Sequence, residues 1–341
     1  MTPIAIFTGG TSAERDIAIA SSKAVARLLD GRYATTTFDF PSDIDAFLAR
    51  RHEFVAAIPV FHGSGGEDGT VQGFLETLGI PYLFSGVAAN AIAMDKDLAK
   101  RIVASAGIKT PAWSVIVSGL SAVSSAKVEA KQSLEEIASV CGPRNDKGFP
   151  CVVKPLDGGS TQGVSIARDR AELDAAVDAA LRFSSSVLVE SFVAGDEFTV
   201  AVPDVPSTGS GSATTFVPNA MPVIQIKSPT GLYDYDAKYG PVPAEKLCPA
   251  PIPDDLAERL QAAALTAHRT IGARHLSRVD FIVDPSDEIW FLEINTIPGL
   301  SVLFPRAVAA SGRDFGEMLA RWIETTIAND PRSDVHRSGD R

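Results

Sequence analysis

The chain has 341 residues, of which 45% are hydrophobic and 21% are charged, and its formal net charge is −11. This length predicts two or three domains with a large buried core, and the composition is ordinary for a soluble globular protein. The acidic balance argues against nucleic acid or an anionic membrane as a general partner, although it leaves room for a local basic site for phosphate.

Cysteine and hydropathy patterns exclude several classes of protein. Three cysteines without CxxC spacing do not suit a disulfide framework or a zinc site. The longest apolar runs, such as residues 54–61, are too short to cross a bilayer, and the strand-like start at Ile4 leaves no room for a signal peptide. We therefore expect a cytoplasmic enzyme without a membrane partner.

Residues 1–93 alternate between strand-like and helical patterns. This alternation predicts a domain with a parallel sheet and helices on both faces, in which substrates bind beyond the carboxyl ends of the strands. Two glycine-rich loops, at residues 8–12 and 62–69, fall at those ends. The expected elements are a strand at 4–7, a helix at 13–29, a strand at 33–40, a helix at 44–51 and a strand at 54–61.

Two further segments are expected, at 94–194 and 195–330, followed by a disordered polar tail at 331–341. The expected elements of the first are helices at 95–106 and 171–181 and strands at 150–155 and 187–190. Those of the second are strands at 198–202, 223–226, 279–283 and 289–294 and helices at 254–271 and 314–327. A serine-rich stretch within 118–148 and a flexible hairpin insert at 203–213 interrupt these segments.

Asp280, Glu293 and Asn295 present hard oxygen ligands on two strands that the turn at 284–287 joins. Glu293 and Asn295 are two residues apart, so their side chains share one face of a strand, and Asp280 can lie across from them. Two carboxylates and an amide suit Mg2+, which often bridges nucleotide phosphates. Arg278 shares the face of Asp280 and is either a transition-state clamp or one half of a structural ion pair.

The loop after the strand at 150–155 is rich in glycine and hydroxyl groups. Its glycines let backbone amides approach a phosphate, and Ser160 and Thr161 add donors, but the same pattern suits a plain hairpin turn. Lys154 favours the phosphate site, because an unpaired ammonium is costly to bury in an apolar strand and a phosphate would neutralise it. The alternative is a lysine whose ammonium reaches the surface.

Acidic residues near the end of the strand at 187–190 are candidates for binding a nucleotide. Glu190, with backbone groups of Phe192 and Val193, could read an adenine edge, and Glu197 could reach ribose hydroxyls. Taken alone, each acid is better explained as a solvated surface group.

Residues 233–239 carry three tyrosines, two aspartates and a lysine. Surface loops rarely hold so many large aromatics unless they fold over something, so this loop could be a lid that excludes water. Lys238 in it could reach a transferring phosphate. A strand with alternating tyrosines is the alternative.

Two residues of the first segment are candidates for binding a substrate. Glu14 follows the first strand at the start of a helix, where it could bind an ammonium group or could be an ordinary acid at a helix N-terminus. His62 lies at the end of the strand at 54–61 with Glu67 and Asp68, in what is otherwise a glycine-rich loop with charged tips.

Seven motifs in this order and spacing make the chain resemble the D-alanine–D-alanine ligases of the ATP-grasp superfamily over residues 4–327. They are Thr8-Gly-Gly-Thr-Ser-Ala-Glu-Arg15, residues 62–73 with Gly65-Gly-Glu-Asp-Gly69, Met94-Asp-Lys96, Val153-Lys-Pro155 with Gly159-Ser160, residues 233–239, Arg278-Val-Asp280 and Glu293-Ile-Asn-Thr-Ile-Pro-Gly299.

The resemblance implies a three-domain ATP-grasp fold of the α/β (α+β) class, with ATP between the central and C-terminal domains. It also implies a ligase in which ATP phosphorylates the carboxylate of one D-alanine and the amine of a second amino acid attacks the acylphosphate. The products would be ADP, phosphate and D-alanyl-D-alanine for peptidoglycan. The partners would be small amino acids, ATP with Mg2+ or Mn2+, and a second copy of the chain in a homodimer.

The resemblance further implies a role for each matching residue. ATP would be bound by Lys96, Lys154, Glu190 and Glu197, and adenine flanked by Phe192 and Val193. The metal would be held by Asp280, Glu293 and Asn295. The first amino acid's ammonium would be bound by Glu14, and a link between Ser160 and Tyr239 would orient that substrate. The tetrahedral oxyanion would be stabilised by Arg278 and the backbone amide of Gly299.

The chain departs from the family pattern after Gly299. The family continues with a longer stretch in which a serine helps to bind the second substrate's carboxylate, whereas residues 300–305 here carry Ser301 as the one hydroxyl. His275 also stands where a glycine is common. A second hypothesis is therefore a related ATP-grasp ligase with a different second substrate, in specialised metabolism. A third, a nucleotide-binding protein without turnover, is opposed by the complete set of charged site residues.

Overall fold

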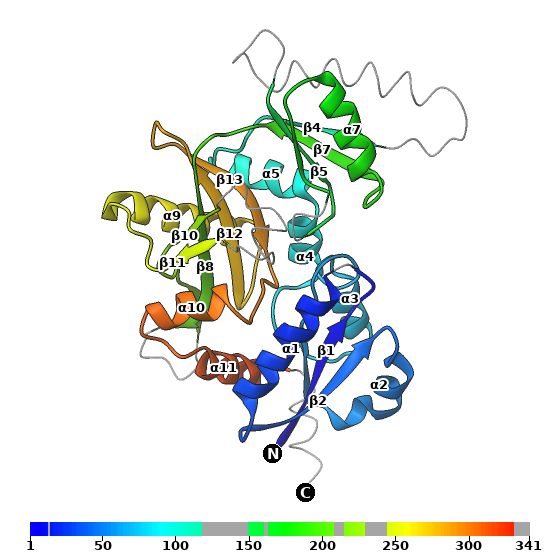
Figure 1. The fold of residues 1–341 in the computed structure, drawn as a ribbon. Helices are drawn as coiled ribbons and strands as arrows, with labels where there is room; N and C mark the ends of the chain where they lie inside the picture. The colour runs from blue at the N-terminus through cyan, green and yellow to red at the C-terminus, as the bar shows by residue number, and fades with distance from the viewer. Residues whose placement is uncertain (13, 118–148, 160–162, 208–214, 229–243, 331–341) are drawn as a thin grey trace, which may run out of the picture.

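The computed structural model describes residues 1–12, 14–117, 149–159, 163–207, 215–228 and 244–330. Three β-sheets follow one another along the chain, each with helices packed against it (Figure 1). In Figure 1 the N-terminal sheet, in blue, lies below the two later sheets. This mixed helix and strand architecture agrees with the fold class expected from the sequence.

The N-terminal sheet has three parallel strands, as predicted. They are β1 (Thr2–Gly9), β2 (Tyr33–Phe40) and β3 (Ala56–Pro59), in the order β2-β1-β3. The central strand β1 is buried from Ile4 onward, which explains its continuous apolar run. The accompanying helices are α1 (Arg15–Leu29), α2 (Ile44–Arg50), which continues as a 3-10 turn at Arg51–Glu53, and α3 (Thr70–Thr77).

The second sheet is antiparallel and has the order β4-β7-β5-β6. Its strands are β4 (Trp113–Val117), β5 (Cys151–Pro155), β6 (Ser165–Ala167) and β7 (Ser186–Ser191). Helix α7 (Arg170–Ala180) covers one face, where Leu173, Ala176 and Val177 share a core with Val153 and Val189. Helices α4 (Val87–Met94) and α5 (Lys96–Ser105) lead from the N-terminal part of the chain to this sheet.

The third sheet has six antiparallel strands, in the order β11-β10-β8-β12-β13 with β9 paired to β8. The strands are β8 (Asp196–Pro206), β9 (Phe216–Pro218), β10 (Ile224–Lys227), β11 (Glu245–Leu247), β12 (Leu276–Val283) and β13 (Ile289–Asn295). Helix α9 (Asp254–Thr270) packs against β8 and β12 and buries Leu256, Leu260 and Ala264. This burial at a spacing of about four residues is the helical period that the sequence showed.

The last two helices, α10 (Leu303–Ala310) and α11 (Phe315–Ala328), bring the end of the chain back to its beginning. Helix α11 contacts α1, and its Trp322 belongs to the same buried core as Ile4, Ile6 and Val25. The N-terminal sheet is therefore packed against residues more than 300 positions later in the sequence.

The structure differs from the sequence predictions at several elements. The sequence pattern does not predict α3, α4 or α10: α3 begins in a glycine-rich loop and contains Gly73, α4 is apolar without a clear period, and α10 carries Pro305. Proline is tolerated there because it lies in the first turn of the helix. The strand expected at 54–61 is shorter, at Ala56–Pro59, because only these residues of the segment pair with β1.

Some predictions lie beyond the described residues. The serine-rich stretch at 118–148, residues 208–213 of the expected insert and the tail at 331–341 are in this group. The insert was expected to begin at residue 203, but 203–206 continue strand β8 and 203–205 are buried. The expected domain boundaries near residues 94 and 195 stay predictions. Among the described helices, none is long and apolar enough to cross a membrane.

His275 joins the N-terminal and C-terminal parts of the chain. Its Nδ1 accepts a hydrogen bond from the Phe84 backbone N–H at 3.0 Å, and its ring stacks on Trp322 with ring centroids 5.4 Å apart. Its own backbone N–H donates to Oδ2 of Asp204 at 2.6 Å. Burial, helped by the neighbouring charge of Arg274, lowers the pKa of His275 to about 3, so the ring is held neutral as an acceptor.

The buried neutral ring predicts a pH-dependent stability. Between about pH 6.5 and about 3, the unfolded chain protonates His275 while the folded chain does not, so the free energy of unfolding falls as the pH falls through this window. The contribution is at most about 1.4 kcal/mol per pH unit. In His275→Asn, the amide oxygen can still accept the Phe84 N–H, and asparagine tolerates the positive φ of 66° at this position. At pH 7 the free energy of unfolding of this variant should be about 1 kcal/mol lower than that of the unmodified protein, because the stacking on Trp322 is lost. Its free energy of unfolding should fall less steeply as the pH is lowered.

The measurement is urea unfolding of both proteins at several pH values between 7 and 4.5. Equal pH slopes for the two proteins would contradict the assignment of this proton uptake to His275.

Candidate active site

A pocket of about 570 Å³ lies between the second and third sheets. Strands β5 and β7 supply one wall, and β8, β10, β12 and β13 supply the other. The sequence-predicted residues that line it are Lys96, Lys154, Glu190, Phe192, Val193, Glu197, Asp280 and Glu293. Residues expected to bind a nucleotide and residues expected to bind a metal therefore share one cavity.

Glu190 is a buried carboxylate that two lysines share. Nζ of Lys154 lies 2.6 Å from its Oε1, and Nζ of Lys100 lies 2.7 Å from its Oε2. Burial alone would raise the pKa of Glu190, but the two ammonium groups outweigh that effect and the pKa is lowered. The interpretation of Glu190 as a solvated surface acid is therefore wrong, and the Lys154 ammonium has a carboxylate partner rather than reaching the surface.

Lys96, at the first position of α5, is buried at the edge of the pocket. Its Nζ donates hydrogen bonds to the backbone carbonyls of Gly158 and Leu156 in the glycine-rich loop. Burial lowers the pKa of Lys96, and the charge of Glu293 opposes this effect. One ammonium thus connects the start of the glycine-rich loop with the acidic wall of the pocket.

The strand pair β12–β13 brings the three candidate metal ligands together, as predicted from their spacing. Asp280 pairs in register with Glu293, and Arg278 pairs with Asn295. Nδ2 of Asn295 lies 3.5 Å from Oδ2 of Asp280 and 3.4 Å from Oε1 of Glu293. Asp280 also accepts hydrogen bonds from Arg278, whose Nη2 is 2.7 Å from Oδ2, and from the hydroxyl of Thr199 on β8.

This donor set fits a small hard cation. Two carboxylates lie beside one amide, and rotation of the Asn295 amide about its last bond would turn its oxygen toward both of them. Across the described residues, no group of three or more His, Cys, Asp and Glu side chains is placed to hold a metal. A metal at this position would therefore need the amide, water and phosphate oxygens to complete its coordination.

Glu14 lies where the N-terminal part of the chain meets the glycine-rich loop. A Cβ atom added to Gly159 would collide with its carboxylate, and one added to Gly63 would lie 2.9 Å from its Oε2. Only glycine allows these two loops to approach the carboxylate so closely. The structure therefore brings Glu14 within reach of the loop that follows Lys154, although the two are 140 residues apart in the sequence.

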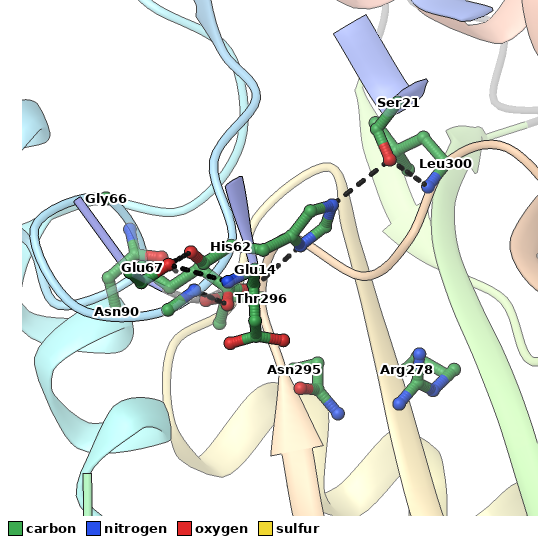
Figure 2. Close-up of polar contacts among 12 residues, drawn as sticks. Glu14, Ser21, His62, Gly66, Glu67, Asn90, Arg278, Asn295, Thr296 and Leu300 are labelled. Carbon is green, nitrogen blue, oxygen red and sulfur yellow. Dashed lines mark hydrogen bonds and ion pairs between the residues drawn. The ribbon is translucent and has the colours of Figure 1, made fainter. Parts of the chain in front are cut away.

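His62 is buried and connects the N-terminal sheet with the loop after β13 (Figure 2). Its Nε2 lies 3.1 Å from Oγ of Ser21, which accepts a hydrogen bond from the backbone N–H of Leu300 at 3.2 Å. Its Nδ1 lies 3.9 Å from Oε1 of Glu67. Nearby, the hydroxyl of Thr296 donates to Oδ1 of Asn90 at 2.6 Å. Figure 2 shows these side chains in the same region as Glu14, Arg278 and Asn295.

Ser301 lies apart from these residues. It is exposed and lines a shallow hollow with residues on the outer face of α1, among them Asp16, Lys23 and Arg27. Gly299, just before it, is half-buried at the end of the segment that follows β13. Three further predicted site residues, Ser160, Lys238 and Tyr239, lie outside the described residues.

The sequence interpretation missed several residues of this region, notably Lys100, Thr199, Ser21 and Asn90. One signal was available for Lys100: it lies four positions after Lys96 and therefore on the same face of the helix. No local pattern marks Thr199, Ser21 or Asn90, because their partners lie between 41 and 279 positions away.

Comparisons with known sequences indicate the family. A family model described as "D-ala D-ala ligase C-terminus" matches residues 102–324. The D-alanine–D-alanine ligase of Desulforudis audaxviator is 39% identical over 324 residues, which cover 94% of this chain and 97% of that protein. The corresponding ligase of Desulfotalea psychrophila is 37% identical over 327 residues, covering 94% of both chains.

Solved structures agree with the sequence matches. The D-alanine–D-alanine ligase of Bacillus anthracis superposes with a TM-score of 0.75 at 28% identity, covering 96% of this chain and 98% of that one, and a structure of that ligase complexed with ATP has a TM-score of 0.73. The VanG D-Ala:D-Ser ligase of Enterococcus faecalis has a TM-score of 0.75 at 26% identity, covering 95% of this chain and 99% of that one. The chain described here belongs to the D-alanine–D-alanine ligase family.

Proposed function

We propose that this protein is an ATP-dependent ligase that joins two D-alanine molecules into D-alanyl-D-alanine for peptidoglycan synthesis. The observation that carries this proposal is the pocket between the second and third sheets. It places Lys154 and Glu190 on one wall and Asp280 and Glu293 on the other. A cationic wall facing an acidic one suits a nucleotide whose phosphates lie between lysine and a metal ion.

The nucleotide would lie along the pocket. Lys96 and Lys154 would contact its phosphates, the carboxylate of Glu190 and the backbone of Phe192 and Val193 would meet the adenine, and Glu197 would reach the ribose. All of these residues line the cavity. Lys238 would add a further cation near the transferred phosphate.

Asp280, Glu293 and Asn295 would hold Mg2+, or Mn2+ in its place. Their geometry supports this role, because the two carboxylates are paired in register and the amide lies within 3.5 Å of each. When bound, the cation would neutralise the charge that builds up between the phosphates during transfer.

The chemistry needs two bonds to form and two to break. A carboxylate oxygen of the first D-alanine attacks the γ-phosphorus of ATP, the bond to the bridging oxygen breaks, and ADP leaves. The amine of the second D-alanine then attacks the acylphosphate carbon, and the proton that its nitrogen loses passes to the leaving phosphate or to solvent. When the carbon–oxygen bond breaks, phosphate leaves and the peptide bond remains. The tetrahedral oxyanion between these events would be stabilised by Arg278 and the backbone amide of Gly299.

The amino acids would bind where the N-terminal loops approach the pocket. Glu14 would bind the ammonium of the first substrate, and its contact with Gly159 supports a position near the acyl group. His62, linked through Ser21 to the Leu300 amide, would shape the site of the second substrate. Ser160 and Tyr239 would form the link that closes the loop.

The wider organisation follows the same proposal. Residues 1–93, 94–194 and 195–330 would be the three domains of an ATP-grasp enzyme, which would assemble as a homodimer in the cytoplasm.

A related ligase with a different second substrate is the second candidate. The observation in its favour is the shortened segment after Gly299, in which Ser301 is exposed beside α1. Structural similarity to a D-Ala:D-Ser ligase is also compatible with this candidate.

The leading proposal predicts ADP release from Mg-ATP with D-alanine as the single amino acid, together with a product of the mass of the dipeptide. L-Alanine should give no turnover, because the substrates are expected to be bound by stereospecific contacts. The panel should include D-alanine paired with D-serine and with other acceptors. ADP release only with one of these pairs would replace the leading proposal by the second candidate.

The metal assignment predicts that Glu293→Gln lowers kcat/KM by about 10²-fold or more, because loss of one anionic ligand weakens both the metal and its hold on the phosphates. Glu288→Gln is the matched control: it changes an exposed carboxylate just before the same strand and should leave the activity unchanged. Rates would be measured as a function of Mg2+ concentration. Unaltered activity of Glu293→Gln would exclude this residue as a metal ligand.

A further inference from the structure

Lys100 is a fully buried lysine behind the wall of the nucleotide pocket. Its side chain has no exposed area, and it lies outside the set of described residues that line the pocket. Burying an ammonium group is costly unless it is paired and hydrogen-bonded. A lysine in such a place therefore has partners that compensate the cost, and the partners indicate its role.

Three groups surround the Lys100 ammonium. Nζ lies 2.7 Å from Oε2 of Glu190, donates a hydrogen bond to Oγ1 of Thr110 at 2.6 Å, and lies 5.3 Å from the centre of the Trp113 ring. Trp113 on β4 pairs in register with Glu190 on β7. The strand that carries Glu190 and the segment that leads into its neighbour thus both contact the Lys100 ammonium.

The two lysines bound to Glu190 are not equivalent. Lys154 lines the pocket and its side chain is 10% exposed, whereas Lys100 is enclosed. If Lys154 turns toward a phosphate in the pocket, it leaves Oε1 of Glu190 without a cation. The carboxylate then stays ionised only if Lys100 remains on Oε2.

We infer that Lys100 is a positioning residue that keeps Glu190 ionised and oriented as a hydrogen-bond acceptor, and that this selects a purine with a 6-amino group over one with a 6-oxo group. The inference rests on the proposed function, which places the base of the nucleotide beside Glu190. A 6-amino group donates to a carboxylate. A 6-oxo group is itself a hydrogen-bond acceptor, so its oxygen and the carboxylate oxygen of Glu190 repel each other.

The experiment is calorimetric titration with Mg-ATP and with Mg-ITP, whose base carries an oxygen in place of the 6-amino group of adenine. The unmodified protein should bind ATP about 10-fold to 100-fold more tightly than ITP, because a site built for a donor leaves a buried acceptor unpaired when the donor is missing. In Lys100→Met the dissociation constant for ITP divided by that for ATP should fall about tenfold, toward one. The reason is that Glu190 without Lys100 either takes up a proton or keeps Lys154 as its ion-pair partner.

Two further variants keep the test independent of folding. Lys100→Arg retains the charge and should retain most of the ratio. In Glu190→Gln the carboxylate is absent, so adding Lys100→Met should change the ratio no further. This double variant removes the enclosed ammonium together with its carboxylate and leaves only Lys154, whose side chain lines the pocket. Lys109→Met, which removes an exposed lysine nearby, is the control and should leave both affinities unchanged.

A ratio in Lys100→Met equal to that of the unmodified protein would overturn the inference. So would an equal binding of ATP and ITP by the unmodified protein, or an effect of Lys100→Met that persists in the Glu190→Gln background. A purely structural role would lower the thermal midpoint and weaken both nucleotides alike, leaving the ratio unchanged. Failure of the proposed function appears separately, as nucleotide binding without ADP release from D-alanine.

Discussion

The pocket between the second and third sheets depends on one buried carboxylate. Glu190 lies on β7 between β4 and β5, where it neutralises Lys154 from the neighbouring strand and Lys100 from α5. Neither ammonium could be buried alone, and removing one member of such a cluster leaves an uncompensated charge that is strongly destabilising. The same cluster leaves one more positive than negative charge at this wall. An overall acidic protein can therefore still present a cationic surface to phosphate.

The opposite wall is organised by the pairing of β12 with β13. Register places Asp280 across from Glu293 and Arg278 across from Asn295, so four polar side chains meet on one face of the sheet. A β-bulge follows Asp280, and bulges are common beside active sites because they redirect side chains. Thr199 on β8 and Arg278 each bind the Asp280 carboxylate, which restricts its orientation. The two walls thus differ in charge because two different sheets supply them.

The N-terminal part of the chain is attached to this pocket at several points. Ser21 on α1 binds the backbone of Leu300, Asn90 on α4 binds Thr296, and Phe84 binds the ring of His275. Each contact joins the C-terminal part of the chain to the N-terminal part, and the buried core shared with α11 reinforces them. The loops that carry Glu14 and His62 are therefore held against the segment that follows β13, as a reaction between two amino acids at one acyl group would require.

By itself, the sequence determined the elements with a clear period and the residues within one element. The two-residue spacing of Glu293 and Asn295 and the apolar alternation around them were enough to predict the strands of the candidate metal site. The apolar run at Ile4–Phe7 was enough to predict a buried parallel strand. Only the tertiary structure decided the partners of the buried charges. Lys154 suggested a phosphate and Glu190 a solvated acid, yet they bind one another across adjacent strands, and Lys100 joins them from a helix 90 positions away. Local patterns record which face of an element is buried, but the pairing of charges depends on how distant elements pack.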